Sequence, residues 1–138
     1  MNAVAPIVIR DHEFIPEKGS HSPNGKACVM EMVSYLAHEA WSDHPSCSSP
    51  VIAAFCRRLW DSQPKAWPGL IERIDRIAGS ADPSKDKARG YLAHDWLVRR
   101  FAPRWLRRAG LEDDAAKLEA VAPVTDEATA KKAREAAE

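Results

Sequence analysis

One short turn of the sequence brings together the residue types that could carry out chemistry. Asp43, His44 and Cys47 lie within five positions, just before a helix start at Ser49 and Pro50. A histidine can deprotonate a neighbouring thiol, a carboxylate can orient that histidine, and a helix start favours a thiolate. This spacing makes Asp43, His44 and Cys47 the candidate catalytic residues of a thiol- or metal-dependent enzyme.

A structural role explains the same turn with fewer requirements. Asp43 can brace the turn, His44 can bond to a backbone carbonyl, and Cys47 can be a small buried apolar group. No pattern for an oxyanion hole accompanies these three residues. We therefore favour the structural role and keep the enzyme as the alternative.

Four side chains of zinc-binding types lie along the same part of the sequence: His21, Cys28, His44 and Cys47. An apolar stripe of helical period predicts a helix over residues 26–41, roughly 24 Å long. This helix would place the first two side chains near its start and the last two beyond its end. Zinc ligands lie within ~2.3 Å of the metal. We therefore predict no metal site, and we expect no cofactor.

The stretch "EKGSHSPNGKACVMEMV" raises the question of a phosphate-binding loop. Five residues separate Gly19 from Gly25 where the nucleotide-binding motif has four, and Ala27 follows Lys26 where a hydroxyl is needed. Pro23 also removes one backbone N–H. The stretch therefore predicts a turn into the helix, with anion binding by Lys26 at the helix start as an alternative.

The middle of the sequence is basic, and both ends are acidic, although the net charge is zero. Five arginines lie close together at the end of this basic region: Arg99, Arg100, Arg104, Arg107 and Arg108. Together with Trp67, in a proline-rich connection, they are the candidate interaction residues. Binding of nucleic acid through backbone phosphates is the alternative use of these arginines.

The length of the chain favours a single domain, and its composition favours a cytoplasmic protein. The chain has 138 residues and an odd number of cysteines, which do not form a disulfide framework. No apolar run approaches the ~20 residues that span a bilayer, and the first residues lack the pattern of a signal peptide. We therefore expect no association with membranes.

Periodicity predicts an all-α fold, a compact bundle of five to six helices with an irregular N-terminal arm. Pro50 and Pro83 each suit the first position of a helix, and the apolar helix of about 83–101 is expected to be central. The predicted organisation has three parts: an arm (1–25), a helical domain (26–122), and an alanine-rich tail that is either a solvated helix or disordered (123–138).

Two blocks, "GSHSPNGKACVMEMVSYLAHEAWSDHPSC" and "ARGYLAHDWLVRRFAPRWL", resemble a family of small uncharacterised proteins from actinobacteria and their phages. The resemblance implies a compact helical domain and no particular reaction. Asp43, His44 and Cys47 match the shared block, whereas similar proteins often carry Gly at the position of His38.

These observations together predict a non-enzymatic protein-interaction factor, phage-encoded or host-regulatory, that binds a protein partner. The alternatives are the enzyme based on Asp43, His44 and Cys47, and a non-specific nucleic-acid binder based on the arginines of 99–108.

Overall fold

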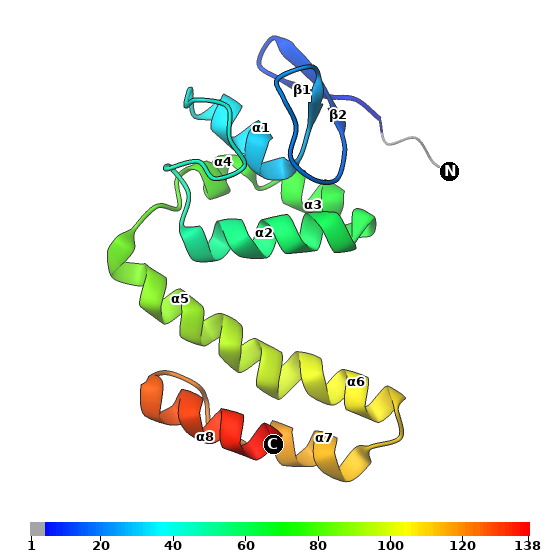
Figure 1. Cartoon of the computed structure of the whole chain (residues 1–138), viewed down its shortest axis with the longest axis vertical. Coiled ribbons are helices and arrows are strands. Elements are labelled where there is room, and N and C mark those ends of the chain that lie inside the picture. Colours follow the sequence, from blue (N-terminus) through cyan, green and yellow to red (C-terminus); the bar gives the residue numbers. More distant parts are fainter. Residues whose placement is uncertain (1–4) are drawn as a thin grey trace. The chain divides into compact units, whose positions relative to one another are not determined.

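The structure is a computed structural model that describes residues 5–138 (Figure 1). The chain divides into two compact units, unit 1 (Met1–Pro83) and unit 2 (Ser84–Glu138). The fold is mostly helical, with a small sheet near the N-terminus, so the prediction of an all-α fold is correct only in part. Within residues 5–138, every helix is too short or too polar to cross a lipid bilayer.

A three-stranded sheet replaces much of the predicted irregular arm, of which residues 1–4 lie outside the described part. Strand β1 (Ile7–Ile9) pairs antiparallel with β2 (His12–Pro16), and β2 pairs parallel with the short β3 (Lys26–Ala27). Alternation places Phe14 and Pro16 on the buried side of β2, as expected for a half-buried strand.

The turn between β1 and β2 depends on a side chain from another part of unit 1. Arg10 occupies the left-handed region with φ 59°, although it is not a glycine. Its guanidinium donates hydrogen bonds to the carbonyl of Leu36 (2.6 Å) and to Nδ1 of His38 (2.8 Å). These contacts hold a turn that lacks the usual Asn-Gly or Asp-Gly pair.

Helix α1 (Val29–Leu36) is half the length that the apolar stripe predicts. It ends at Leu36, with Ala37 as its C-cap, because His38 has φ 59° and cannot continue a right-handed helix. The prediction of a helix over 26–41 is therefore wrong at both ends. The backbone N–H groups of residues 37–39 instead bond back to carbonyls of the last turns.

Among the other helices of unit 1, α2 (Pro50–Ser62) begins where Pro50 predicts. It has Pro50 in its first turn and Ser49 before it. A 3₁₀ turn, η1 (Pro64–Ala66), leads into two short helices, α3 (Trp67–Ile71) and α4 (Ile74–Ala78).

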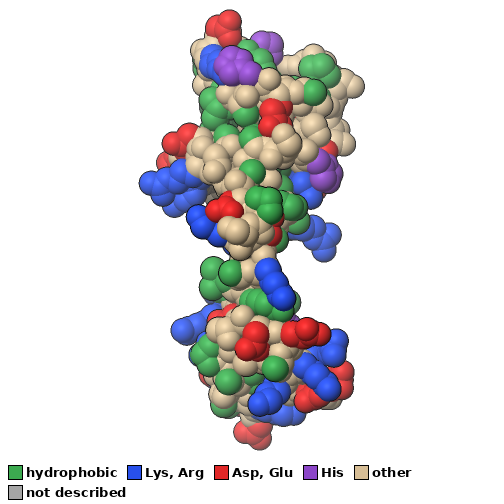
Figure 2. All heavy atoms as spheres, turned by 90° about the vertical axis from the view of Figure 1, so that its left-hand side faces the viewer, with side chains coloured by type: hydrophobic (Ala, Val, Ile, Leu, Met, Phe, Trp, Pro, Cys, Tyr) green, Lys and Arg blue, Asp and Glu red, His purple; other side chains and the backbone are tan. Residues whose placement is uncertain are grey.

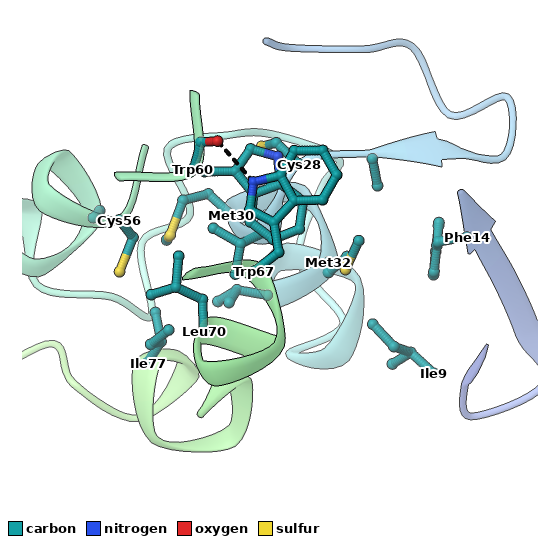
Figure 3. Packing of buried hydrophobic residues seen from close by; sticks show 14 residues of the cluster. Ile9, Phe14, Cys28, Met30, Met32, Cys56, Trp60, Trp67, Leu70 and Ile77 are labelled. Carbon is teal, nitrogen blue, oxygen red and sulfur yellow. Dashed lines mark hydrogen bonds between the residues drawn. The ribbon is translucent and has the colours of Figure 1, made fainter. Parts of the chain in front are cut away.

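The core of unit 1 joins the sheet to helices α1 to α4 (Figure 3). The rings of Trp60 and Trp67 stack with their centroids 4.3 Å apart, and Trp67 Nε1 donates to the carbonyl of Trp60 at 2.7 Å. Each indole thus supplies apolar area while its N–H is bonded, because Trp60 Nε1 donates to the carbonyl of Glu17.

Unit 2 contains a long run of helix followed by two shorter helices. The run consists of α5 (Pro83–Trp96), the π-helical turn η2 (Leu97–Phe101) and α6 (Ala102–Arg108). Helix α7 (Glu112–Glu119) starts with three acidic residues, and α8 (Glu127–Ala137) follows. The helix start predicted at Pro83 is confirmed.

The expectation that the helix of about 83–101 is central is wrong. No residue of α5 within the described chain is buried, and Leu92 is 69% exposed. The inward side of the run is formed instead by Val98, by the fully buried Pro103 and by the half-buried Leu106. Apolar residues on all sides of a helix therefore do not mark burial in this protein.

Pro103 explains the π turn that joins α5 to α6. Proline has no N–H, and its ring clashes with the carbonyl four residues earlier, here that of Arg99. The wider turn carries the chain past this point, with the N–H of Ala102 bonded to the carbonyl of Leu97. The run therefore stays helical at a residue type that usually kinks or breaks a helix.

A second, smaller core holds unit 2 together. Its buried members are Val98, Leu118, Val124 and Ala133. Helix α8 thus contributes an alanine to the core, and part of the predicted tail is an ordered helix that packs on unit 2. Its start is capped by Asp126, whose carboxylate accepts from the N–H of Thr129 at 2.8 Å.

Candidate functional site

The structure places two of the three candidate catalytic residues in direct contact. His44 Nδ1 and Asp43 Oδ1 are 2.7 Å apart, and the His44 side chain is 67% exposed. The backbone N–H of His44 donates to Ser42 Oγ, which is the kind of turn contact expected of a structural role.

Cys47 lacks the surroundings of an activated thiol. Its Sγ lies 3.8 Å from Ser48 Oγ, and burial raises the pKa of the thiol, with the negative charge of Glu39 adding to this effect. A nucleophilic cysteine needs the opposite shift. The carboxylate of Glu39 accepts hydrogen bonds from the N–H and Oγ of Ser46, both at 2.7 Å, and so helps to shape the turn.

The predicted separation between the glycine-loop residues and this turn is wrong. Helix α1 spans about 12 Å instead of 24 Å, and the segment after it runs back beside it. Trp41 Nε1 donates to the carbonyl of His21 at 2.6 Å, and the N–H of Ser42 donates to Ser34 Oγ. The two parts of the sequence therefore lie next to each other.

A cavity of about 280 Å³ lies where these two segments meet helix α2. Its lining includes Cys28, Asp43, Arg57 and Asp61. Burial raises the pKa of the Cys28 thiol to about 12, and an Arg57 N–H donates to the carbonyl of Asp43 at 2.9 Å. In residues 5–138, no three side chains of His, Cys, Asp or Glu converge as a metal ion would require.

The most densely bonded side chain in unit 1 is Glu31, which the sequence prediction did not single out. This carboxylate is 1% exposed and accepts from the N–H of Cys28 (2.7 Å), the N–H of His21 (2.5 Å) and His21 Nδ1 (2.9 Å). A glutamate three residues after a helix cap is half of a capping box, with Cys28 in place of Ser or Thr. The three-residue spacing from Cys28 to Glu31 was the sequence signal that could have identified Glu31.

The same contacts bear on the anion site predicted at Lys26. The Lys26 ammonium pairs with Glu17 at 2.8 Å, and this contact lowers the pKa of Glu17. Glu17 also contacts His21 Nε2 at 2.9 Å. The carboxylate of Glu31 already accepts from the N–H of Cys28 at the start of α1 and places a negative charge where an external anion would bind.

Trp67, predicted as an interface anchor if exposed, is a core residue. It is 6% exposed and stacks on Trp60. Its surface is therefore not available to a partner.

The five candidate arginines differ in what they contact. Arg99 pairs with Asp95 at 3.1 Å, and Arg107 binds the carboxylates of Glu112 and Glu119. These two arginines are therefore engaged by carboxylates within unit 2. Over the face of unit 2 that Figure 2 shows, basic and acidic side chains are interspersed.

The other arginines lie at the surface of unit 2. Arg100, Arg104 and Arg108 are exposed at intervals of four residues. The guanidinium carbon of Arg108 lies 5.1 Å from the centre of the Trp105 ring, a cation–π contact.

Besides Leu92, four large apolar side chains on the same run of helix are exposed, and we call them the aromatic face: Trp96, Leu97, Phe101 and Trp105. Their exposed fractions are 49%, 49%, 40% and 53%. The ring centroids of Trp96 and Phe101 are 5.2 Å apart, and those of Phe101 and Trp105 are 6.1 Å apart. The sequence contains these residues, but their period alone predicts burial.

An open groove of about 520 Å³ lies beside the aromatic face. Its lining comes from η2, α6, α7 and the end of α8 and is formed by apolar side chains: Leu97, Phe101, Trp105, Leu106, Leu118 and Ala137, with two further alanines. Aromatic rings beside such a groove are typical of surfaces that bind another protein.

Comparison with known proteins adds no relative: no family model, no curated protein and no solved structure matches this chain.

Proposed function

We propose that this protein is a non-enzymatic interaction factor that binds an apolar segment of another protein on the aromatic face of unit 2. The observation that carries the proposal is the series of Trp96, Phe101 and Trp105, each at least 40% exposed, on one continuous helical run. When a partner covers these rings, their apolar surface is removed from contact with water, which favours binding.

The type of residue on this face also supports the proposal. Tryptophan and arginine dominate the residues that contribute most to protein–protein affinity. Here Arg108 lies over Trp105, so that an aromatic anchor and a charge form one unit at the surface. The groove beside them offers room for an apolar side chain of the partner.

The enzyme alternative has less support. Asp43 and His44 are bonded to each other, but the raised pKa of Cys47 leaves its thiol protonated at neutral pH. A nucleophilic role would need a thiolate.

Nucleic acid is the second candidate, because exposed aromatic rings and arginines also occur together on surfaces that bind single strands. Two of the five arginines are neutralised by carboxylates of unit 2, which weakens this candidate. Its signature would be a gel-shift affinity that falls steeply with salt.

The proposal is tested by affinity selection. The purified full chain is used to select binders from a random peptide display library, and the binding of enriched peptides is then measured by calorimetry. Trp105→Ala and Phe101→Ala are each expected to weaken binding about tenfold or more.

Phe55→Ala is the matched control, because Phe55 is an exposed phenylalanine (52%) on α2 of unit 1. It should leave the affinity unchanged. If no peptide is enriched, or if binding is insensitive to Trp105→Ala and Phe101→Ala, the proposed function is wrong.

A further inference from the structure

We infer that the partner segment is an amphipathic helix that carries one large apolar anchor and, beside it, acidic residues about one turn apart. This inference rests on the proposed function and specifies the partner of the same surface.

The shape of the groove indicates the anchor. Leu106 and Leu118 from two packed helices lie on the groove lining together with Phe101 and Trp105. Main-chain groups of the partner would find few hydrogen-bonding side chains here, because the lining residues are alanine, leucine, phenylalanine and tryptophan. A segment whose backbone is bonded internally, as in a helix, avoids leaving these groups unpaired.

The position of the arginines indicates the acidic residues. Arg104 and Arg108 are exposed and are four residues apart on α6, so they project from the same side of the helix. Across residues 5–138, ion pairs engage Arg99 and Arg107, but no carboxylate pairs with Arg104 or Arg108. Two carboxylates three or four residues apart on a partner helix would match this spacing.

Charge also separates this partner from a second copy of the chain. In a symmetric contact the same patch faces itself, so Arg104 and Arg108 would meet a surface that carries the same two positive charges. Like charges in that position oppose association, whereas carboxylates favour it.

The same selection experiment tests this inference, because the library is not biased in charge. We expect the enriched peptides to become helical on binding and to carry acidic residues next to an aromatic or aliphatic anchor. Arg104→Gln and Arg108→Gln should each weaken binding about two- to fivefold, and the effect should shrink at high salt. Replacing the peptide carboxylates by amides should remove the effect of Arg104→Gln.

Arg58→Gln is the control, since Arg58 is an exposed arginine on α2 of unit 1. Peptides that bind through Trp105 but lack acidic residues, or that ignore Arg104→Gln, would overturn this inference and leave the proposed function standing. Peptides that ignore Trp105→Ala overturn the function itself.

Two further outcomes also decide against the inferred partner. The first is a dimer in sedimentation experiments that Trp105→Ala abolishes, which would identify a second copy as the occupant. The second is salt-sensitive binding of single-stranded nucleic acid that Trp105→Ala removes.

Discussion

The imidazole of His21 and the buried carboxylate of Glu31 lie 2.9 Å apart, and they join the loop before β3 to helix α1. The other ring nitrogen of His21 contacts Glu17, also at 2.9 Å. A buried carboxylate is costly unless hydrogen bonds replace its lost hydration. The N–H groups of His21 and Cys28 supply that replacement, so the loop and the helix start stabilise each other.

Glu31→Gln should therefore destabilise unit 1 strongly. The amide offers one acceptor oxygen in place of two, and its NH₂ group would face the N–H donors of His21 and Cys28. We expect a loss of about 2–3 kcal/mol in the free energy of unfolding, measured by urea denaturation of the full chain. Glu13→Gln, at an exposed glutamate of β2, should change it by less than ~0.5 kcal/mol. Equal effects of the two substitutions would refute the role given to Glu31.

His38→Gly should preserve or raise stability, although it removes a hydrogen bond. A non-glycine residue in the left-handed region costs roughly 1–2 kcal/mol, and His38 has φ 59°. Glycine removes this cost but makes the unfolded chain more flexible and loses the contact with Arg10. We expect the free energy of unfolding to rise by between 0 and about 1 kcal/mol, measured by thermal unfolding.

Two comparisons make the test of His38 specific. His38→Val should destabilise, because a β-branched residue fits this conformation poorly. Ala40→Gly, in the same loop but without a positive φ, should not stabilise. Strong destabilisation by His38→Gly would show that the bond from Arg10 outweighs the backbone strain.

The three thiols should react slowly in the native protein. Burial raises the pKa of Cys28 to about 12 and that of Cys56 to about 11, and it also raises the pKa of the less buried Cys47. Because the thiolate is the reactive form, iodoacetamide should modify Cys47 first and only as the pH rises above the ~8.5 of a free thiol.

Peptide mass spectrometry of the alkylated protein checks this order. The same reaction in urea is the control, in which all three cysteines should react alike. Alkylation of native Cys47 at neutral pH faster than that of free cysteine would revive the enzyme hypothesis.

Asp95 should make the stability of unit 2 depend on pH. Its pKa lies below the ordinary value of 3.8, chiefly because the N–H of Val124 donates to Oδ1 at 2.9 Å and also because of Arg99. Folding therefore favours the charged form, and this stabilisation is present above the ordinary pKa and is lost as the pH falls through the lowered pKa.

Asp95→Asn should consequently lower the free energy of unfolding by about 1 kcal/mol near neutral pH. The difference in this free energy between the variant and the unmodified protein should become smaller in acid. Urea unfolding followed by circular dichroism from about pH 7 to about pH 3 measures both curves. Asp113→Asn, at an exposed aspartate of α7, is the matched control and should cost no more than ~0.5 kcal/mol. Parallel curves for Asp95→Asn and the unmodified chain would contradict the role of the charge.

The elements that the sequence predicts well are those that depend on local signals. Pro50 and Pro83 mark helix starts because their fixed φ suits the first turn whatever surrounds it. The acidic residues that begin α7 act through the helix dipole, which is equally local. Gly110 has φ 79° just after α6, as expected of a residue that ends a helix.

The elements that were missed depend on contacts distant in the sequence. The strands are short, and the turn between β1 and β2 is held by bonds from Arg10 to Leu36 and His38. The same histidine makes α1 end at Leu36, five residues before Trp41, although the apolar period continues past it. No local pattern carries this information.

The candidate site shows the same division. Asp43 and His44 are neighbours in sequence and in space, so their contact could be foreseen. The burial of Trp67 and the exposure of Trp105 could not be foreseen, because both residues are tryptophans and only their packing in the folded chain makes one buried and the other exposed. Glu31 was recognisable in principle from its distance to Cys28.

The π turn at Leu97–Phe101 sets the phase between the two halves of the long helix. Such a turn holds one residue more than an α-helical turn would, and each residue rotates the chain by about 100°. Shortening it by one residue would swing Trp96 away from Phe101 while every side chain of the surface was still present. A single deletion in this turn would therefore disrupt the aromatic face by rotating its two halves apart, without replacing any of its side chains.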